Sequence, residues 1–545
     1  MSISQNTTSR QQSWLPAQLR EVATLPNLVG LVGAILTLFL LIRLPQPWNI
    51  RAAVYLMLLI WTILRPRVAL YLMPIAVPWG SLDSLTLAGL NLNSADILVF
   101  FLAVGWLLGC ALRPATYRGE MGVDEVGPRD RAPFNVPWYL VASILLLLAA
   151  MFLSMTVAVD IRSSLKEVAK WLEFLLLILF GTQYIRTRRQ LWIIVVLILL
   201  AGVSQAFYGY FQYFFNLGPT SFIRASSLRV YGTFGQPNPF AGYINMPLSI
   251  AIALLVLGRT WLTRVLAGSA AVLLGAAIYL SQSRGAEIAF AASLLFILFI
   301  GIPGLRRPFG IAATIGGVLI GALCIGLIPL YVFNPLFKQF GLTQISFTAP
   351  TNADYSTAER IAHWIAGIRM FMTHPFLGVG IGNYGAVYPN YYATIFVNSL
   401  DQAHNYYINV AAEMGAIGLT VFLLFIMAQF VAGGSAFQKI SARCQKAKAQ
   451  ATTPKPSVLR PTEMKERRSL LLHPIKMMNH YHPAGIHGVA QNLGNDRALA
   501  VGLLAALLTV CVHNLVDDMY VHSMTNLMAL LLIMLIALER TSRNL

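Results

Sequence analysis

Charged residues are scarce in this 545-residue chain, because Asp, Glu, Lys and Arg together make up only 11% of it. Ordinary soluble domains carry roughly a quarter charged residues. Hydrophobic residues account for 57% of the chain, which excludes a soluble globular protein. Apolar runs near the roughly 20 residues that cross a bilayer recur along the whole sequence. We therefore predict an all-α polytopic membrane protein.

Cysteine is also rare, and its spacing excludes two common uses. The four cysteines, Cys110, Cys324, Cys444 and Cys511, include no C-x-x-C pair, so neither a zinc site nor a disulfide framework is indicated. The polar first 25 residues lack the apolar core and small-residue cleavage site of a signal peptide. We expect the first apolar run to remain as a signal anchor, and we expect no bound metal and no cofactor.

The apolar runs predict about 12 to 14 transmembrane helices, because the second and third runs are short and could form one broken hairpin. The candidate helices cover residues 28–44, 50–64, 67–80, 95–112, 136–157, 165–184, 190–214, 238–257, 262–281, 285–302, 309–333, 405–433, 497–516 and 523–538. Within the sixth run, Lys170 and Glu173 lie one helical turn apart. We interpret them as an internal ion pair.

Acidic residues are the scarcer charge, with 21 Asp and Glu against 39 Lys and Arg, a formal net charge of +18. Cytoplasmic loops of membrane proteins collect Lys and Arg. Alternate threading of the helices puts all the basic connections on one side, namely 186–190, 258–264, 304–308, 434–496 and 539–545. This pattern predicts a multi-pass protein of the cytoplasmic (inner) membrane with both termini in the cytoplasm. The positive charge then serves topology and attraction to membrane lipids, and no nucleic acid partner is needed.

The loops differ in character on the two sides. Residues 434–496 are basic, polar and interrupted by proline, and we expect a disordered cytoplasmic insertion. The same threading leaves residues 334–404 outside as a long external loop. Its stretch STAERIAHWIAGIRMFMTHPF, residues 356–376, has apolar residues at helical spacing, which predicts an amphipathic helix on the outer membrane surface. Residues 374–392 are dense in Gly, Pro, Asn and Tyr and predict irregular backbone.

Arginines on the predicted outer face suggest an anion site. Arg224 and Arg229 precede a helix whose first turn contains Asn238, and a helix start offers free N–H donors and a positive dipole end. Arg284 lies in a very short outer turn, three residues before Glu287. A guanidinium at that depth needs a partner, which is either Glu287 or a phosphate ligand. The alternative for each arginine is a snorkelling or ion-paired anchor.

His404 is the second residue of AHNYYINVAAEMGAIGL, where a polar loop meets an apolar run, and it is followed by Asn405. The ordinary pKa of histidine, near 6.5, suits proton transfer. The alternative is a residue of the helix-cap region, or a polar residue whose hydrogen bonds are satisfied. Near the end of the chain, HNLVDDMYVHS brings His513 and Asp517 to the same outer face. These two residues either hydrogen-bond to the site or cap the last hairpin.

Five stretches together carry a family resemblance. They are RVYGTFGQPNPFAGY, SQSRGAEIAF, AERIAHWIAGIRMFMTHPFLGVGIGNY, AHNYYINVAAEMGAIGL and HNLVDDMY. In this order they resemble the O-antigen ligase and O-antigen polymerase superfamily, from about residue 200 to 530. The resemblance implies a metal-independent glycosyltransferase that uses a lipid-linked oligosaccharide, with a helical membrane core and an external loop over the active site. The long insertion at 434–496 departs from compact members of the superfamily.

The resemblance also suggests roles for the outer residues. A donor glycan on undecaprenyl diphosphate would have its diphosphate held by Arg229 and Arg284, together with Arg360. His404 would be the catalytic group that orients or deprotonates a hydroxyl of a saccharide or glycolipid acceptor. The expected supporting residues are Arg224, Asn238, Glu287, Asn405, His513 and Asp517.

We expect four regions in the chain. They are N-terminal transmembrane helices at 1–200, a ligase-like catalytic core at 201–433, the insertion at 434–496 and a C-terminal transmembrane hairpin at 497–545.

Two other functions remain as alternatives to a ligase. One is a polysaccharide polymerase of the same superfamily, whose acceptor is a second lipid-linked repeat. The other is a transporter of bicarbonate or another solute. Transporters place charge near the bilayer midplane at repeated, broken helices, whereas here the polar residues cluster at one face, which favours an enzyme.

Overall fold

Long helices make up nearly all of the structure. The computed structural model describes residues 48–305 except 83, 88, 89, 113–135 and 225, then 307, 308, 310, 311, 314, 315 and 318, then 355–452 except 394, and finally 483–544. Eight helices among these residues are long and apolar enough to cross a membrane. The predicted fold class, an all-α polytopic membrane protein, is therefore confirmed. The predicted span 28–44 and most of the span 309–333 lie outside the described residues.

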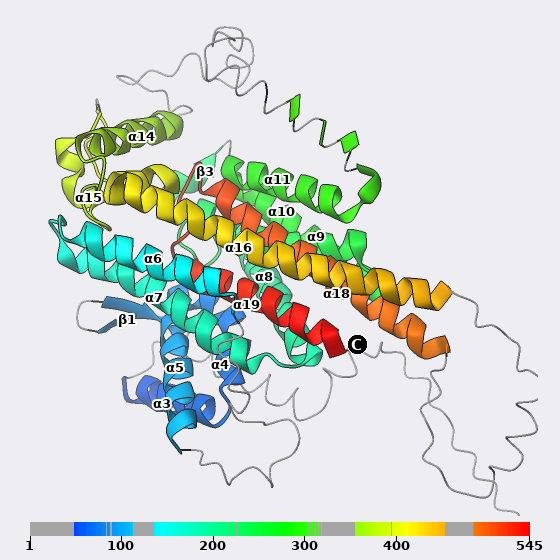
Figure 1. Cartoon of the computed structure of the whole chain (residues 1–545). Helices are drawn as coiled ribbons and strands as arrows, with labels where there is room; N and C mark the ends of the chain where they lie inside the picture. Colours follow the sequence, from blue (N-terminus) through cyan, green and yellow to red (C-terminus); the bar gives the residue numbers. More distant parts are fainter. Residues whose placement is uncertain are drawn as a thin grey trace, which may run out of the picture.

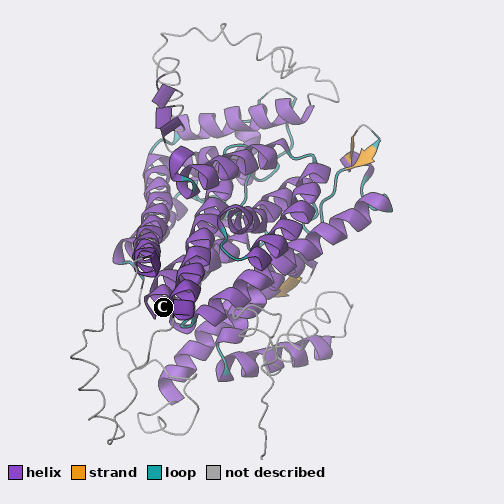
Figure 2. Cartoon of the chain, turned by 90° about the vertical axis from the view of Figure 1, so that its right-hand side faces the viewer, coloured by secondary structure: helices purple, strands orange, loops and turns teal. Residues whose placement is uncertain are grey.

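Each predicted apolar run that lies within the described residues forms a helix, although α16 and α18 extend well beyond their predicted bounds (Figure 1). Their bounds are α3 (Trp48–Leu64), α4 (Arg67–Trp79), α5 (Ser94–Leu112), α6 (Trp138–Met155), α7 (Ile161–Tyr184), α8 (Arg188–Phe214), α9 (Pro237–Leu257), α10 (Trp261–Ser281), α11 (Arg284–Gly301), α14 (Tyr355–Thr373), α15 (Tyr384–Val387), α16 (Tyr406–Thr452), α18 (Pro483–His513) and α19 (Met524–Thr541). Two short antiparallel hairpins are present, β1 (Ser84–Leu87) with β2 (Leu90–Asn93) and β3 (Ile223–Arg224) with β4 (Ser227–Leu228) (Figure 2).

Three helices form the centre of the bundle. In the apolar windows of α9, α18 and α19, 78%, 78% and 83% of the residues are buried, against 33% in α10 and in α11. Figure 1 shows α16 and α18 side by side along much of their length, and α18 also packs against α9 and α11. The first turn of α9 and the last turn of α18 are therefore fixed by packing on several sides. Both of these turns carry predicted site residues.

Helix α16 is broken near its start at Gly415. This residue has φ +65°, a left-handed conformation that glycine adopts without strain from a Cβ atom. The N–H group of the next residue, Ala416, donates to the carbonyl oxygen of Pro375 at 2.7 Å. The break therefore separates a first segment, which packs against the loop after α14, from the long apolar remainder of the helix. His404 and Asn405 directly precede that first segment.

The predicted amphipathic helix forms as α14, but its buried face consists mainly of small residues. Ala358, Ala362 and Ala366 are fully buried, whereas the Ile368 and Met372 side chains are exposed. Small side chains let α14 approach α16 closely, since the two helices pack against each other. The predicted irregular segment 374–392 contains only the one-turn helix α15 and one 3-10 turn.

Two expectations about local structure are wrong. The segment 434–452 continues α16, and α18 begins at Pro483, so the predicted disordered insertion is helical at both ends. Its middle, residues 453–482, lies outside the described residues. In α7 the Lys170 ammonium pairs with Glu167 at 2.8 Å and not with Glu173. The Glu173 carboxylate instead accepts a hydrogen bond of 3.1 Å from Asn526 of α19.

Candidate active site

The centre of the candidate site is a contact between His404 and Asp517. The Nδ1 atom of His404, at the start of α16, lies 3.2 Å from Oδ1 of Asp517, which follows α18. The side chain of His404 is 15% exposed and that of Asp517 only 5%. An imidazole that donates Nδ1–H to a carboxylate keeps a lone pair on Nε2. The two side chains are therefore of the types that form a general base and the carboxylate that orients it.

The backbone of His404 is held from both sides. Trp364 of α14 donates its indole N–H to the His404 carbonyl oxygen at 3.2 Å. His404 itself has φ +51°, a left-handed conformation that is uncommon for a residue with a side chain. The following Asn405 side chain donates to the carbonyl oxygen of Leu515 at 2.7 Å. The loop that carries His404 is thus tied to the segment that carries Asp517.

Asn405, not His404, caps α16. The Asn405 Oδ1 atom accepts hydrogen bonds from the backbone N–H groups of Tyr407 at 3.0 Å and Ile408 at 3.1 Å. Asn is among the preferred residues at a helix N-cap, because its side-chain oxygen satisfies N–H groups that have no partner in the helix. His404 is therefore not the residue that caps α16. Its ring contacts Asp517 instead, as would be expected either of a polar residue with a satisfied hydrogen bond or of a catalytic group.

Asp517 is held in its charged form. Burial by itself opposes ionisation, but the hydrogen bond with His404 and the positive charges of His404 and Arg360 outweigh it and lower the pKa of Asp517 to about 2. The Arg360 guanidinium lies 3.6 Å from Oδ2 of Asp517. At neutral pH the carboxylate is therefore negative, and it faces Nδ1 of His404.

Arg229 is positioned by two hydrogen bonds at the ends of α9 and α10. Its Nε–H group donates to the carbonyl oxygen of Ser281 at 2.9 Å, and its Nη2 atom donates to Oδ1 of Asn238 at 3.1 Å. Burial, followed by the charges of Arg224 and Arg360, lowers the pKa of Arg229 to about 10. Asn238, in the first turn of α9, thus helps to fix the Arg229 guanidinium.

The other arginines extend the same positive surface. Burial, followed by the charges of Arg284 and Arg360, lowers the pKa of Arg224. The Nη2 atom of Arg224 donates to the hydroxyl of Ser356 near the start of α14 at 3.3 Å, which connects the segment before α9 to α14. The structure therefore brings Arg224, Arg229, Arg284 and Arg360 into one cluster, although they come from positions 136 residues apart in the sequence.

Arg284 begins α11 and its side chain is exposed. In the described part of the chain it forms no ion pair with Glu287, whose side chain is also exposed. Of the two partners considered for this guanidinium, Glu287 is therefore not the one the structure uses. Its donors remain available to an anion, beside the free N–H groups of the first turn of α11.

His513 lies beneath the cluster and does not reach its surface. The residue is only 1% exposed and ends α18. Gly242 of α9 and Gly285 of α11 pack against its ring, since a Cβ atom added there would lie 3.1 Å from Nδ1 and 2.9 Å from Nε2 respectively. These glycines let the starts of α9 and α11 approach the end of α18. We interpret His513 as a residue that supports the site from below.

Three further side chains lie around His404, and no sequence motif pointed to them: His363, Tyr388 and Glu359. The buried ring of His363 lies 5.9 Å from the His404 ring, edge to face, and stacks on Tyr388 at 4.6 Å. Burial, followed by the charge of His404, lowers the pKa of His363 to about 4. Burial also raises the pKa of Glu359, one turn earlier on α14. The shared i, i+4 spacing of Glu359 and His363 beside Arg360 was the signal available in the sequence.

No group of three or more His, Cys, Asp and Glu side chains suited to a metal ion occurs in the part of the chain that the structure describes. The site consists of a positive cluster, a histidine with an orienting carboxylate, and two helix starts. Such an arrangement can bind a multiply charged anion and accept a proton beside it.

Comparison with known proteins agrees with the predicted resemblance. No curated protein matches the chain. A family model described as O-antigen ligase matches residues 269–423. This segment contains Arg284, Arg360 and His404, whereas Arg229 and Asp517 lie on either side of it. Over residues 269–423, which hold three residues of the candidate site, the chain is thus similar to the O-antigen ligase family, as its motifs predict.

Proposed function

We propose that this protein is an O-antigen ligase-like glycosyltransferase that moves a glycan from undecaprenyl diphosphate to an acceptor hydroxyl. The reaction takes place at the outer face of the cytoplasmic membrane and needs no metal. The family match supports a ligase- or polymerase-like role in general. The single observation that carries the specific proposal is the arrangement of four arginines around the contact of 3.2 Å between His404 and Asp517.

The arginines would hold the diphosphate of the donor. Arg229 and Arg284 start or flank the two helix N-termini, and Arg360 of α14 lies 3.6 Å from Asp517. Charge-assisted hydrogen bonds from guanidinium groups to phosphate are among the strongest in proteins. During transfer, negative charge accumulates on the departing diphosphate, so donors fixed beforehand at that position lower the barrier.

His404 would act on the acceptor. With Nδ1–H donated to Asp517, the Nε2 lone pair accepts the proton of an acceptor sugar hydroxyl. The hydroxyl oxygen then bonds to the anomeric carbon of the donor while the bond from that carbon to the diphosphate oxygen breaks. The configuration at the anomeric carbon inverts. Asp517, charged at neutral pH, stabilises the imidazolium that forms.

A site at the ends of apolar helices suits both substrates. A polyprenyl chain stays in the bilayer while its diphosphate lies at the surface, and the acceptor sugar approaches from water. His404 directly precedes an apolar helix, and Arg284 begins another. These positions support a site at which a lipid-linked headgroup and a soluble hydroxyl meet. The basic connections on the opposite side support an outer location for this end.

An assay with the purified full-length protein in detergent tests the proposal. The donor is a glycan linked to undecaprenyl diphosphate, and the readout is release of free undecaprenyl diphosphate with and without glycolipid acceptors. We expect release that depends on acceptor and is lost in His404→Ala. Release with donor alone, accompanied by longer glycans, would identify the polymerase alternative. No release with any acceptor, together with solute uptake in vesicles, would instead support a transporter.

A further inference from the structure

A cavity of about 450 Å³ opens between α6, α16 and α19, far from the candidate active site. Helix α19 begins at Met524, just after the segment that carries Asp517, and its last residues line the cavity. Its 18 residues span about 27 Å at 1.5 Å per residue, close to the roughly 30 Å of a bilayer's hydrocarbon core. The cavity therefore lies near the opposite membrane surface.

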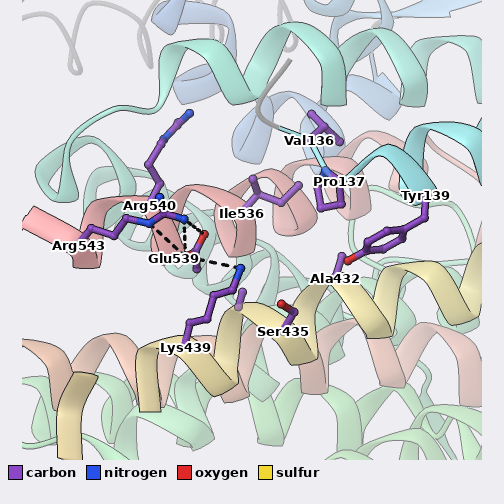
Figure 3. Close-up of a pocket in the computed structure, with 11 residues that line it drawn as sticks. Val136, Pro137, Tyr139, Ala432, Ser435, Lys439, Ile536, Glu539, Arg540 and Arg543 are labelled. Carbon is purple, nitrogen blue, oxygen red and sulfur yellow. Dashed lines mark hydrogen bonds and ion pairs between the residues drawn. The ribbon is translucent and has the colours of Figure 1, made fainter. Parts of the chain in front are cut away.

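Positive charge is in excess at this cavity. Figure 3 shows Lys439 of α16 and Arg543 reaching the Glu539 carboxylate from two sides. The distances to Oε1 of Glu539 are 3.9 Å for Lys439 and 2.9 Å for Arg543, and Arg443 also contacts that atom at 3.2 Å. Three cations thus share one carboxylate, which leaves two positive charges unbalanced.

Two of the three cations that line the cavity, Lys439 and Arg543, can reach a ligand. The third, Arg540, donates to the carbonyl oxygens of Thr182 and Ile185. The side chains of Lys439 and Arg543 are 53% and 58% exposed, whereas that of Glu539 is only 13% exposed. At 3.9 Å the Lys439 ammonium is beyond hydrogen-bond distance of Glu539, so its three donors remain available. An anion can therefore contact both cations while Glu539 keeps its bond to Arg443.

The rest of the cavity is lined by uncharged hydroxyl and apolar side chains. The hydroxyls of Ser435 and Tyr139 line it and form no hydrogen bond with other residues in the described ranges. Beside them lie the apolar side chains of Ala432, Ile536 and Pro137. The cavity thus passes from cations through free hydroxyls to an apolar wall. A phospholipid has the same order of chemistry, from its phosphate through its glycerol esters to its acyl chains.

We propose that this cavity binds the headgroup of an anionic glycerophospholipid from the membrane leaflet opposite the candidate active site. Lys439 and Arg543 contact the phosphate, Ser435 and Tyr139 donate to the glycerol or ester oxygens, and the acyl chains leave along exposed apolar side chains of α6 and α16, such as Leu145 and Val431. Basic pockets between transmembrane helices are a recurrent form of acidic-lipid site. The bound lipid joins α6, α16 and α19 at the end of the bundle, and its binding is independent of the glycosyl-transfer proposal.

Native mass spectrometry of the full-length protein, with dioleoylphosphatidylglycerol titrated into neutral detergent, tests this site. The double variant Lys439→Gln, Arg543→Gln should bind the lipid at least about tenfold more weakly, as expected for the loss of charge-assisted contacts. The matched control is Lys446→Gln, Lys448→Gln, which removes two charges from exposed positions farther along α16. The control should bind as the wild type does. Equal weakening in both variants would mean a general charge effect and overturn the proposal.

Two further arms separate the lipid from a free anion and the cavity from the surface. Inorganic phosphate at millimolar concentration should not displace the lipid, because it cannot use the apolar wall; displacement at that concentration would overturn the lipid assignment. Ser435→Trp fills the cavity without changing its charge and should also abolish binding. Its melting temperature shows whether the variant is folded. A folded Ser435→Trp protein that keeps wild-type lipid binding would exclude the cavity as the site.

Discussion

The Nδ1 atom of His404 lies 3.2 Å from Oδ1 of Asp517, although the two residues are 113 positions apart in the sequence. Two neighbouring contacts hold the segments that carry them: the N–H group of Tyr406 donates to the carbonyl oxygen of Asn514 at 2.9 Å, and Asn405 donates to Leu515. The start of α16 and the end of α18 thus fix the ring and the carboxylate together. If His404 is a base, Asp517 determines which of its nitrogens carries the proton.

Replacement of Asp517 by Asn should therefore impair the chemistry. The amide keeps the size of the side chain, but it cannot stabilise an imidazolium. We expect turnover to fall by about 10² to 10⁴, the usual contribution of general acid–base catalysis, while the donor still binds. Turnover and donor affinity measured on the purified variant check this result. Asp401→Asn, at an exposed position in the same loop as His404, is the matched control. Wild-type turnover in Asp517→Asn would refute the orienting role.

His404→Ser separates catalysis from helix capping. Because Asn405 caps α16, His404→Ser keeps the helix cap and should lose stability only through its contact with Asp517, whereas its turnover should be lost. Asn405→Ala should remove the cap and lower the free energy of unfolding by about 0.5 to 2 kcal/mol, as for other N-cap residues. Thermal unfolding of both variants beside the transfer assay distinguishes the two roles. An active His404→Ser protein would rule out the catalytic role.

The helices were predictable because each apolar run is a local property of the sequence. Asn405 as the cap was equally open to prediction, since Asn is preferred at that position and histidine is not. The extension of α16 to Thr452 was missed because its composition is polar. Residues such as Ala, Gln and Lys nevertheless have high helix propensity, so a polar segment beyond a membrane helix can continue it.

Pairings between distant segments could not be read from the sequence. Lys170 has an acidic residue one turn away on each side, and both Glu167 and Glu173 satisfy the helical spacing. The structure selects Glu167 because Glu173 is turned toward Asn526 of α19. In the same way, the sequence placed Asp517 on the outer face but did not show which side chain it contacts. Such choices depend on how the helices pack.

Arg229→Ala and Arg284→Ala should each reduce turnover by about 10- to 100-fold, since a hydrogen bond to a charged group contributes roughly 1.5 to 3 kcal/mol. The two variants should differ in stability. Arg229 binds Ser281 and Asn238, so its loss should also lower the melting temperature, whereas exposed Arg284 makes no such contact with the residues that the structure describes. Lysine at either position should restore activity only in part, because it keeps the charge but lacks the bidentate geometry.

Arg369→Ala supplies the control for these arginine variants. Arg369 lies on α14 like Arg360, but its Nη1 atom donates to the carbonyl oxygens of Tyr391 and Tyr392 at 3.3 and 3.0 Å. Its loss should leave donor turnover within about twofold of the wild type, because a contact to a neutral group outside the phosphate site contributes little to catalysis. Full activity of both Arg229→Ala and Arg284→Ala would refute the assignment of the diphosphate site.

Transfer should survive treatment with EDTA. The proposed catalysis depends on arginines and helix N-termini to stabilise the diphosphate, which metal ions do in many other phosphate sites. The assay is run with purified protein before and after chelation, with added Mg²⁺ or Mn²⁺ as the comparison. Complete loss of activity on chelation, restored by one divalent ion, would contradict this prediction. It would direct attention to the acidic segment that contains Asp517 and Asp518.

His363 should make the protein less stable as the pH falls. Burial, followed by the charge of His404, lowers its pKa from 6.5 to about 4, so between these values the unfolded chain binds a proton that the folded protein does not. The stabilising contribution is complete above pH 6.5 and is lost progressively as the pH drops toward 4, by up to about 3 kcal/mol. His363→Phe keeps an aromatic ring against Tyr388 and removes this titration.

Melting temperatures of the wild type and His363→Phe, measured from pH 7.5 to 4.5, check the prediction. The wild type should lose stability relative to the variant as the pH falls. Burial raises the pKa of Asp518 to about 6, which acts in the opposite direction between pH 3.8 and 6, but this group is present in both proteins and cancels in the difference. His374→Phe, which replaces an exposed histidine at the end of α14, is the control and should follow the wild type. Parallel curves for the wild type and His363→Phe would show that the His363 ring does not titrate differently on folding.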